Sequence, residues 1–394
     1  MIRLFISFLF SIWSLCLFAE EQYILRVWLK DKERGEYSLS RPDEFLSDRC
    51  IYRHTKNNIV ITERDLPISP QYKTEIEKVA NRLVCHSKWL NSLVIECDSS
   101  KVSIIEHLPF VKQIEFISRK SIENIEYKSN FYSVGNIKQH PKYGASYPIV
   151  KAVKANKLHK RGVRGEGAYI AVLDDGFGGV DTLEMWFDKE RIKFECDVVN
   201  PGGDIYKEDD HGTAVLSIML AMREGEYIGV APLSDYALIR TEDIRCEAAY
   251  EEDLFVRGLE IADSLGVDII NASLGYGEFG DIISVSTLAS EIATEKGIIV
   301  VTSCGNRGDR GFTHPADAKG VIAVGGINKQ GRVSKFTSRE VVNGKYIAPK
   351  EKALAEDVSI INGSGKIMTT YGTSFASPAV AGAKALEMAN RFNK

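Results

Sequence analysis

The most informative stretch of this 394-residue chain is Tyr169-Ile170-Ala171-Val172-Leu173-Asp174-Asp175-Gly176. Its unbroken run of apolar and aromatic residues is typical of a strand buried on both faces of a parallel sheet. The run ends abruptly in two carboxylates and a glycine, and open α/β sheets place their ligand sites beyond the carboxyl ends of their strands. The stretch therefore predicts an acid that faces a cleft, although an Asx turn closing a strand would give the same pattern.

On both sides of this stretch, from residue 149 to the C-terminus, apolar strands alternate with amphipathic helices. The expected strands are residues 169–173, 236–240, 268–271, 298–302 and 321–324, and the expected helices are residues 211–222, 251–265, 283–296 and 373–391. This alternation predicts a three-layer α/β domain with a mostly parallel central sheet, over residues 148–394.

A histidine opens one of the expected helices, in the segment Asp209-Asp210-His211-Gly212-Thr213-Ala214-Val215. The positive end of a helix dipole disfavours an imidazolium, so a functional His211 would need a compensating acid. An ordinary, partly buried histidine is the alternative for this segment taken alone.

Two further polar residues stand where strands or helices meet loops. Ser374 lies among small residues at the start of the last expected helix, where amide donors favour negative charge beside its hydroxyl. A simple helix cap is the alternative. Asn306 follows a strand and Gly305, and its amide could donate to an oxyanion or merely serve a turn.

Together these segments resemble the subtilisin-like serine proteases, in which the acid, the histidine and the serine follow in this chain order. The motifs that carry the resemblance are Asp-x-Gly at 174–176, His-Gly-Thr-x-Val at 211–215, Gly-Val-Ala-Pro at 229–232, Asn-Ala-Ser-Leu-Gly at 271–275, Ala-Pro at 348–349 and Gly-Thr-Ser-x-Ala-Ser-Pro at 372–378. So many ordered motifs far exceed the false-positive risk of one motif.

The resemblance implies a role for each catalytic residue. Ser374 would attack the peptide carbonyl, with His211 as general base and then general acid, while Asp174 would orient and stabilise the imidazolium. Asp174 is preferred to Asp175 because the family places its acid two residues before the glycine. Asn306 would donate to the oxyanion, together with the backbone amide of Ser374.

The resemblance also implies where the substrate binds. The segment Ser273, Leu274, Gly275 would pair with the peptide main chain as an added strand. The chain departs from the family pattern at Tyr276, which would narrow a pocket. The opposite wall would contain Cys304, Gly305 and Arg307. Arg307 would stand at the rim of the pocket and disfavour basic substrate side chains there. The alternative is that Arg307 is solvated and has no effect on substrate choice.

The first residues predict export. Arg3 is followed by a short apolar run and then Ala19, which is typical of a signal peptide over residues 1–19. The run is short for a membrane anchor. Cys16 suggests a lipoprotein, but Leu15 is bulky where such a site usually has a small residue.

Residues 20–117 have the pattern of a small α+β domain. Strands are expected at residues 23–29, 93–96 and 111–117, and helices at residues 72–85 and 102–108. The domain resembles a propeptide of the same family, which implies a folding assistant and an intramolecular inhibitor whose last strand blocks the cleft. Residues 118–147 are polar and aperiodic, and we expect a linker with the autocleavage site.

Composition limits the partners. The formal net charge is −4, with charges of mixed sign, so neither nucleic acid nor an anionic membrane is indicated. No membrane span is expected in the mature chain. The full sequence has seven cysteines, one of them in the predicted signal peptide, and disulfide pairing stays open.

The sequence predicts no metal site and no required cofactor. It contains no His-Glu-x-x-His motif and no cysteine pair with zinc spacing. Structural calcium at Asp204, Glu208 and Asp209 is possible because relatives bind calcium, but a solvated acidic loop is the simpler interpretation.

The prediction is therefore a secreted serine endopeptidase made as an autoprocessed zymogen, acting on polypeptides. A catalytically silent peptide-binding module of the same fold is the alternative. A lipase-like hydrolase is disfavoured because Ala376 stands where its elbow motif needs glycine. A nucleotide site at residues 162–167 is disfavoured because those glycines precede the strand.

Overall fold

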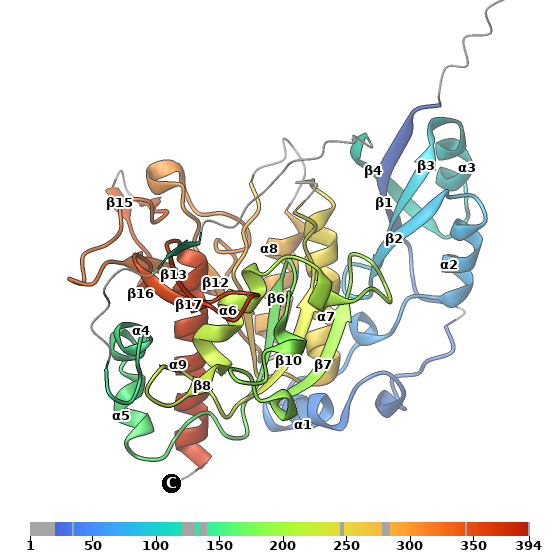
Figure 1. The fold of residues 1–394 in the computed structure, drawn as a ribbon. Helices are drawn as coiled ribbons and strands as arrows, with labels where there is room; N and C mark the ends of the chain where they lie inside the picture. Colours follow the sequence, from blue (N-terminus) through green and yellow to red (C-terminus); the bar gives the residue numbers. More distant parts are fainter. Residues whose placement is uncertain are drawn as a thin grey trace, which may run out of the picture.

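The computed structural model describes residues 20–33, 35–119, 131–133, 140–244, 248–277, 284–342 and 345–392. The predicted signal peptide lies outside these residues. The described chain forms a small N-terminal unit built on an antiparallel sheet and a larger unit built on a parallel sheet (Figure 1).

The larger unit contains a seven-stranded sheet in the order β16-β13-β12-β11-β6-β10-β7, with every neighbouring pair parallel. Its strands are β6 (Tyr169–Asp174), β7 (Ile192–Asp197), β10 (Asp235–Arg240), β11 (Ile269–Ala272), β12 (Ile299–Ser303), β13 (Ile322–Ile327) and β16 (Glu351–Leu354). The five predicted strands are confirmed, and β7 and β16 are additional.

Helices cover both faces of this sheet. The helices α6 (His211–Leu220) and α9 (Ser377–Phe392) pack on one face, and α7 (Glu251–Leu265) and α8 (Val285–Glu295) pack on the other. Each face of the sheet has its own apolar core. Along β6, Ile170 and Val172 belong to the core shared with α6 and α9, while Ala171 and Leu173 belong to the core shared with α7 and α8. Because the strand is buried on both sides, its sequence is continuously apolar. The predicted three-layer α/β fold is confirmed.

Smaller elements complete the larger unit. They are α4 (Tyr147–Ala152), α5 (Ala155–His159), β5 (Tyr132–Ser133), β8 (Met222–Arg223), β9 (Tyr227–Ile228), β14 (Glu340–Val342), β15 (Lys345–Ile347), β17 (Val358–Ile361), β18 (Ile367–Thr370) and short 3-10 turns, of which Thr373–Phe375 precedes α9. Strand β5 pairs with β18 and so joins the edge of the larger unit.

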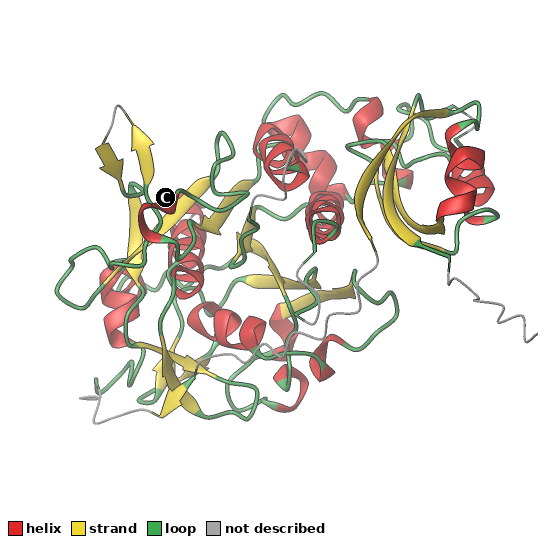
Figure 2. Ribbon diagram, turned by 90° about the horizontal axis from the view of Figure 1, so that it is seen from above, coloured by secondary structure: helices red, strands yellow, loops and turns green. Residues whose placement is uncertain are grey.

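The N-terminal unit has a four-stranded antiparallel sheet in the order β2-β3-β1-β4. Its elements are β1 (Gln22–Leu29), α1 (Asp48–Lys56), α2 (Pro70–Glu77), β2 (Arg82–Ser87), β3 (Ser92–Asp98), α3 (Val102–Glu106) and β4 (Val111–Arg119). One face of the sheet packs against α2 and α3, and the other face packs against α7 and α8 (Figure 2). The predicted α+β character of this unit is confirmed.

The helix predicted over residues 72–85 is wrong at its C-terminal half. Helix α2 ends at Glu77, and β2 begins at Arg82. Ser69 caps α2 and Pro70 occupies its first position, which fixes where the helix starts. The apolar residues that suggested one helix belong to two elements: Ile76 packs in the unit's own core, and Val84 packs toward α7 and α8. Helix α1 was not predicted.

Buried charges join the two units. Arg26 on β1 donates from Nε and Nη2 to both carboxylate oxygens of Asp253 on α7, at 2.8 and 2.7 Å. Glu260, also on α7, accepts from the hydroxyl of Ser87 and from the backbone amides of Lys88 and Trp89. The N-terminal sheet is therefore docked on α7 through polar contacts as well as through the apolar core.

The domain boundaries predicted at residues 117 and 147 fall near chain that the structure does not describe, so they stay predictions. Within the described residues no helix is long and apolar enough to cross a membrane. The described cysteines are all free thiols: Cys50, Cys85, Cys97, Cys196 and Cys304. Cys16 and Cys246 lie outside the described residues.

Candidate active site

Asp174 lies at the carboxyl end of β6, and α6 begins beside it with His211. The two elements approach closely because Gly212 has no side chain. A Cβ at Gly212 would lie 2.2 Å from the carbonyl oxygen of Gly176 and 3.0 Å from Cβ of Asp174. Gly176 and Gly212, the glycines of the two motifs, thus let Asp174 and His211 come into contact.

His211 Nδ1 lies 2.7 Å from Oδ1 of Asp174, whose side chain is 2% exposed. The same oxygen accepts from the backbone amide of Asp175 at 3.1 Å. Burial alone would lower the pKa of His211, but the charge and hydrogen bond of Asp174, with the charges of Asp175 and Glu242, raise it to about 10. Asp174 therefore stabilises the imidazolium, which is the form that His211 takes once it has accepted a proton.

Ser374 sits in the turn that leads into α9, and a chain of buried hydrogen bonds fixes its backbone. Ser377 donates its hydroxyl to Oδ1 of Asn271 at 2.8 Å, Asn271 donates to the Ser273 hydroxyl at 3.0 Å, and Ser273 donates to the carbonyl of Ser374 at 2.7 Å. This chain ties the serine to the carboxyl end of β11. Asn271 and Ser377 were not assigned roles from sequence, although both lie within the quoted motifs.

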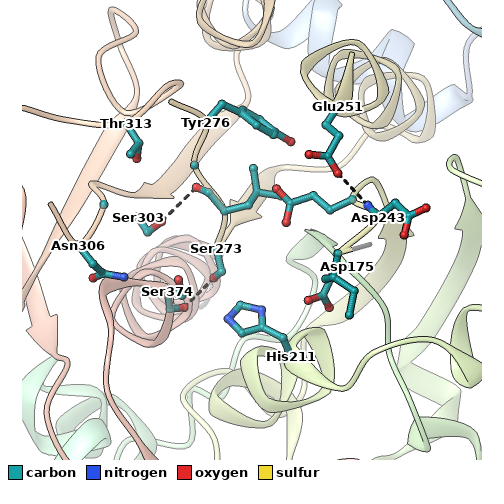
Figure 3. A pocket seen from close by; sticks show the side chains of 15 residues that line it. Asp175, His211, Asp243, Glu251, Ser273, Tyr276, Ser303, Asn306, Thr313 and Ser374 are labelled. Carbon is teal, nitrogen blue, oxygen red and sulfur yellow. Dashed lines mark hydrogen bonds between the residues drawn. The ribbon is translucent and has the colours of Figure 1, made fainter. Parts of the chain in front are cut away.

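Asn306 is oriented by Thr373. Its Oδ1 accepts from the amide of Thr373 at 2.9 Å and from the Thr373 hydroxyl at 3.0 Å. With the oxygen engaged, the amide nitrogen is left to donate, and Figure 3 shows it turned toward Ser374. The structure thus places the Asn306 amide and Ser374 on the same cavity.

His211, Asn306 and Ser374 line one cavity of about 270 Å³ (Figure 3). The full lining is Asp175, His211, Glu242, Asp243, Ile244, Glu251, Ser273, Leu274, Gly275, Tyr276, Ser303, Gly305, Asn306, Thr313 and Ser374. Within the described part of the chain, the Ser374 hydroxyl makes no hydrogen bond to His211. Catalytic hydrogen bonds are often long in unliganded sites and tighten when substrate binds.

Most residues predicted to bind substrate lie on this cavity: Ser273, Leu274, Gly275, Tyr276 and Gly305. Tyr276 exchanges two backbone hydrogen bonds with His314, at 2.8 and 3.0 Å. The phenol of Tyr276 is buried inside the cavity wall, and burial raises its pKa well above the ordinary value.

Among the described residues, neither Cys304 nor Arg307 belongs to the cavity lining, which corrects the placement of Cys304 on the wall and leaves the rim position of Arg307 a prediction. The Cys304 thiol is fully buried behind the wall and points to the carbonyls of Gly305 and Ser338, at 3.5 and 3.7 Å. Successive residues of an extended segment face opposite ways, so Ser303 and Gly305 form the wall and Cys304 packs away from it.

Sequence reasoning missed an acidic wall of the cavity, formed by Asp175, Glu242, Asp243 and Glu251. Glu242 and Asp243 come one residue after the end of β10, which pairs with β6, so the rule that located Asp174 would also have located them. Glu251 begins α7 and accepts from the backbone amides of Asp243 and Ala248, at 3.0 and 3.3 Å. That contact depends on the folded loop and leaves no mark in sequence.

Two groups of described side chains could hold a metal ion: Asp174, Asp175 and His211, and separately Cys50, His54 and Asp263. The second group lies between the two units and already contains the Arg53 guanidinium, which contacts both Asp263 and Cys50.

The acids proposed for calcium have other partners. Asp204 pairs with Lys207 at 2.9 Å, Glu208 pairs with Arg240 at 3.2 Å, and Asp209 accepts from the amide of His211 at 3.0 Å. Calcium there stays a prediction.

Comparison with known proteins gives two family matches. Residues 165–394 match the sequence model described as the subtilase family, and residues 24–132 match the peptidase S8 propeptide domain of Bacteroidota. The second match runs past Ile117, the last residue of the predicted propeptide.

Curated relatives agree with these matches. The chain is 26% identical to a thermostable alkaline protease of Halalkalibacterium halodurans over 79% of its own length and 81% of that protein. It is 30% identical to subtilisin NAT of Bacillus subtilis subsp. natto, over 62% of this chain and 61% of that protein. It is also 30% identical to a subtilisin of Bacillus pumilus, over 60% of this chain and 82% of that protein.

Proposed function

Since the chain belongs to the subtilase family and carries its propeptide domain, we propose that it is a serine endopeptidase whose catalytic residues are Asp174, His211 and Ser374. The observation that carries this proposal is the 2.7 Å contact between the buried Asp174 and His211, on a cavity that Ser374 also lines. A serine hydroxyl and an imidazole on one cavity, with a carboxylate bonded to the imidazole from behind, are the parts that acyl transfer needs.

The reaction follows from the placement of these groups. His211 takes the proton of the Ser374 hydroxyl as the oxygen attacks the carbonyl, and Asp174 stabilises the imidazolium that forms. The oxyanion is met by the Asn306 amide and the backbone amide of Ser374. His211 then gives the proton to the leaving amine, and water, activated in the same way, hydrolyses the acyl-enzyme.

We further propose that the protein is made as a zymogen, is exported by residues 1–19 and is released by cleavage within residues 118–147. Support for the zymogen is the propeptide-domain match and the docking of the N-terminal sheet on α7. The proposed chemistry uses only side chains and backbone amides of the chain, so we propose that no cofactor is required.

The decisive experiment compares the purified protein with a Ser374→Ala variant on casein and on a fluorogenic peptide library. We expect hydrolysis that the variant abolishes while its circular dichroism spectrum is unchanged. Equal hydrolysis by the folded variant would remove Ser374 from the mechanism. Absence of hydrolysis and of fluorophosphonate labelling in the processed wild type would favour the alternative, a silent peptide-binding member of the family.

A further inference from the structure

The cavity has two chemically different ends. One end holds Ser303, Asn306 and Thr313, and the other holds Asp175, Asp243 and Glu251, as Figure 3 shows. The segment that includes Ser273 and Tyr276 runs between the two ends. We name the second end the acidic wall, and it comprises Asp175, Glu242, Asp243 and Glu251.

We propose that the acidic wall binds a lysine or arginine side chain of the polypeptide substrate, next to the scissile bond. This inference rests on the proposed protease function and gives it a substrate class. The wall belongs to the same cavity as Ser374 and His211, so a side chain bound there would belong to the residue being cut or to a close neighbour in the peptide.

Asp175 is the group that points most directly to a cationic ligand. The residue is 6% exposed and lines the cavity, and among the described residues its buried Oδ1 has no hydrogen-bond partner. A buried carboxylate oxygen without a donor costs free energy that a ligand ammonium or guanidinium would recover. Burial and the charge of Asp174 raise the pKa of Asp175 well above its usual value, with Asp209 and Glu242 adding to the rise and His211 opposing it.

Glu251 is in a similar electrostatic position. Burial and the neighbouring charge of Glu242 raise its pKa to about 9, with Asp243 adding to the rise. Arg240 reaches Asp243 at 3.9 Å, but the same guanidinium also binds Asp197 and Glu208. Burial and mutual repulsion therefore disfavour the charged forms of these acids in the empty site, and a bound cation would stabilise the charged forms.

The hypothesis that Arg307 disfavours basic side chains has no support from this arrangement, because Arg307 does not belong to the cavity lining among the described residues. The carboxylates do, and they favour the opposite charge. Arg is expected to bind better than Lys, since its planar fork can engage two carboxylates at once.

The test uses the processed wild-type enzyme and sets of fluorogenic peptides that carry Arg, Lys, Met or Gln at each position around the cut. At one position we expect kcat/KM for Arg and Lys to exceed that for Met and Gln by about tenfold or more. Equal or lower values at every position, with neutral peptides still cleaved, would overturn this inference and leave the protease proposal intact. Loss of every cleavage together with loss of fluorophosphonate labelling would instead overturn the protease proposal.

A variant locates the preference on the wall. Glu242→Gln removes one charge without changing shape, and we expect the ratio of Arg to Met cleavage to fall about fivefold or more. Glu184→Gln is the matched control, because Glu184 lies in an exposed pair with Lys189, outside the cavity lining among the described residues. An unchanged ratio in folded Glu242→Gln would contradict the assignment.

A third measurement needs no variant. We expect butylguanidine, a small guanidinium compound, to inhibit the wild type more strongly than its neutral analogue butylurea. The difference should grow as pH rises toward about 9, where Glu251 loses its proton. Equal inhibition by the two compounds would overturn the inference. A second result would also overturn the inference: added calcium that changes the activity and removes the preference for Arg. A metal ion would then occupy the acidic wall.

Discussion

At the scale of single residues, Thr373 decides which way the Asn306 amide points. Two hydrogen bonds from Thr373 hold the amide oxygen, so the nitrogen is directed to the reacting centre before substrate arrives. Donors fixed in advance need no reorganisation when charge develops, which is why such groups contribute strongly to catalysis.

Asn306→Ala should therefore lower kcat by about 100- to 1,000-fold with a much smaller change in KM, by analogy with the subtilisin donor in the same role. Steady-state kinetics on one fluorogenic peptide measures both. Thr373→Val, which keeps the shape but removes the hydroxyl, should give a smaller loss of the same kind. A loss in Asn306→Ala that appears mainly in KM would mean that the amide binds substrate and does not stabilise the oxyanion.

The pKa of His211 predicts an alkaline protease. Asp174 raises this pKa to about 10 against the burial that opposes it, and only the neutral imidazole can act as base. We expect kcat/KM to rise with pH toward about 10. Asp174→Asn should move this rise toward the usual histidine range near about 6.5 and lower kcat by roughly 10⁴, as the equivalent substitution does in another serine protease triad. A wild-type profile already flat at neutral pH would contradict this.

The same shift affects stability with a defined sign. A histidine whose pKa is raised on folding stabilises the native state fully below its unfolded pKa of about 6.5, and this contribution is lost as pH rises through about 10. Urea unfolding of Ser374→Ala across this range, compared with Ser374→Ala/Asp174→Asn, isolates the contribution without self-digestion.

Residues in short motifs could be predicted from sequence, because each motif keeps its chemistry within a few positions. Contacts that join distant residues could not be predicted in this way. Thr373 is far from Asn306 in the chain, and only the fold brings them together. The same holds for the hydrogen bond from the Ser377 hydroxyl to Asn271.

At the scale of elements, the parallel sheet places the chemistry. Strands β6 and β11 pair directly, so their carboxyl ends present Asp174 and Ser273 at the same edge, and α6 and α9 begin beside that edge. The continuous apolar texture of β6 predicted its burial on both faces correctly. Residues 72–85 misled the prediction because a helix and a strand in succession gave one apparent helical period.

The buried pair between β1 and α7 should control how firmly the N-terminal unit docks. Arg26→Met leaves Asp253 buried without its partner, and removing one member of such a pair costs about 3–5 kcal/mol. We expect this loss in the unfolding free energy of the unprocessed precursor, measured in a Ser374→Ala background.

Two further variants test the cause. Arg26→Met/Asp253→Leu should recover most of the stability, because an apolar pair of similar volume leaves no uncompensated charge. Arg82→Met is the control, since Arg82 is 53% exposed in its pair with Glu96. Equal losses for Arg26→Met and Arg82→Met would show that burial of the first pair has no special effect.

At the scale of the whole molecule, the chain combines the N-terminal propeptide unit with the larger unit on whose helix α7 it docks. We expect purified wild type to convert to a shorter chain whose first residue lies within residues 118–147, and Ser374→Ala to remain full length apart from the signal peptide. Intact-mass and N-terminal analysis measure both. Active enzyme with residues near Gln22 still covalently attached would contradict processing at this linker.

The central claim is that Ser374 is a nucleophile activated by His211 and Asp174, and covalent labelling tests it most directly. Processed wild-type enzyme is treated with a fluorophosphonate, digested and mapped by mass spectrometry, beside His211→Ala prepared by cleavage with an added protease. The account predicts that Ser374 is the one phosphonylated residue in the wild type and that Ser374 is not labelled in the variant. An adduct on another serine, or equal labelling of Ser374 without His211, would contradict it.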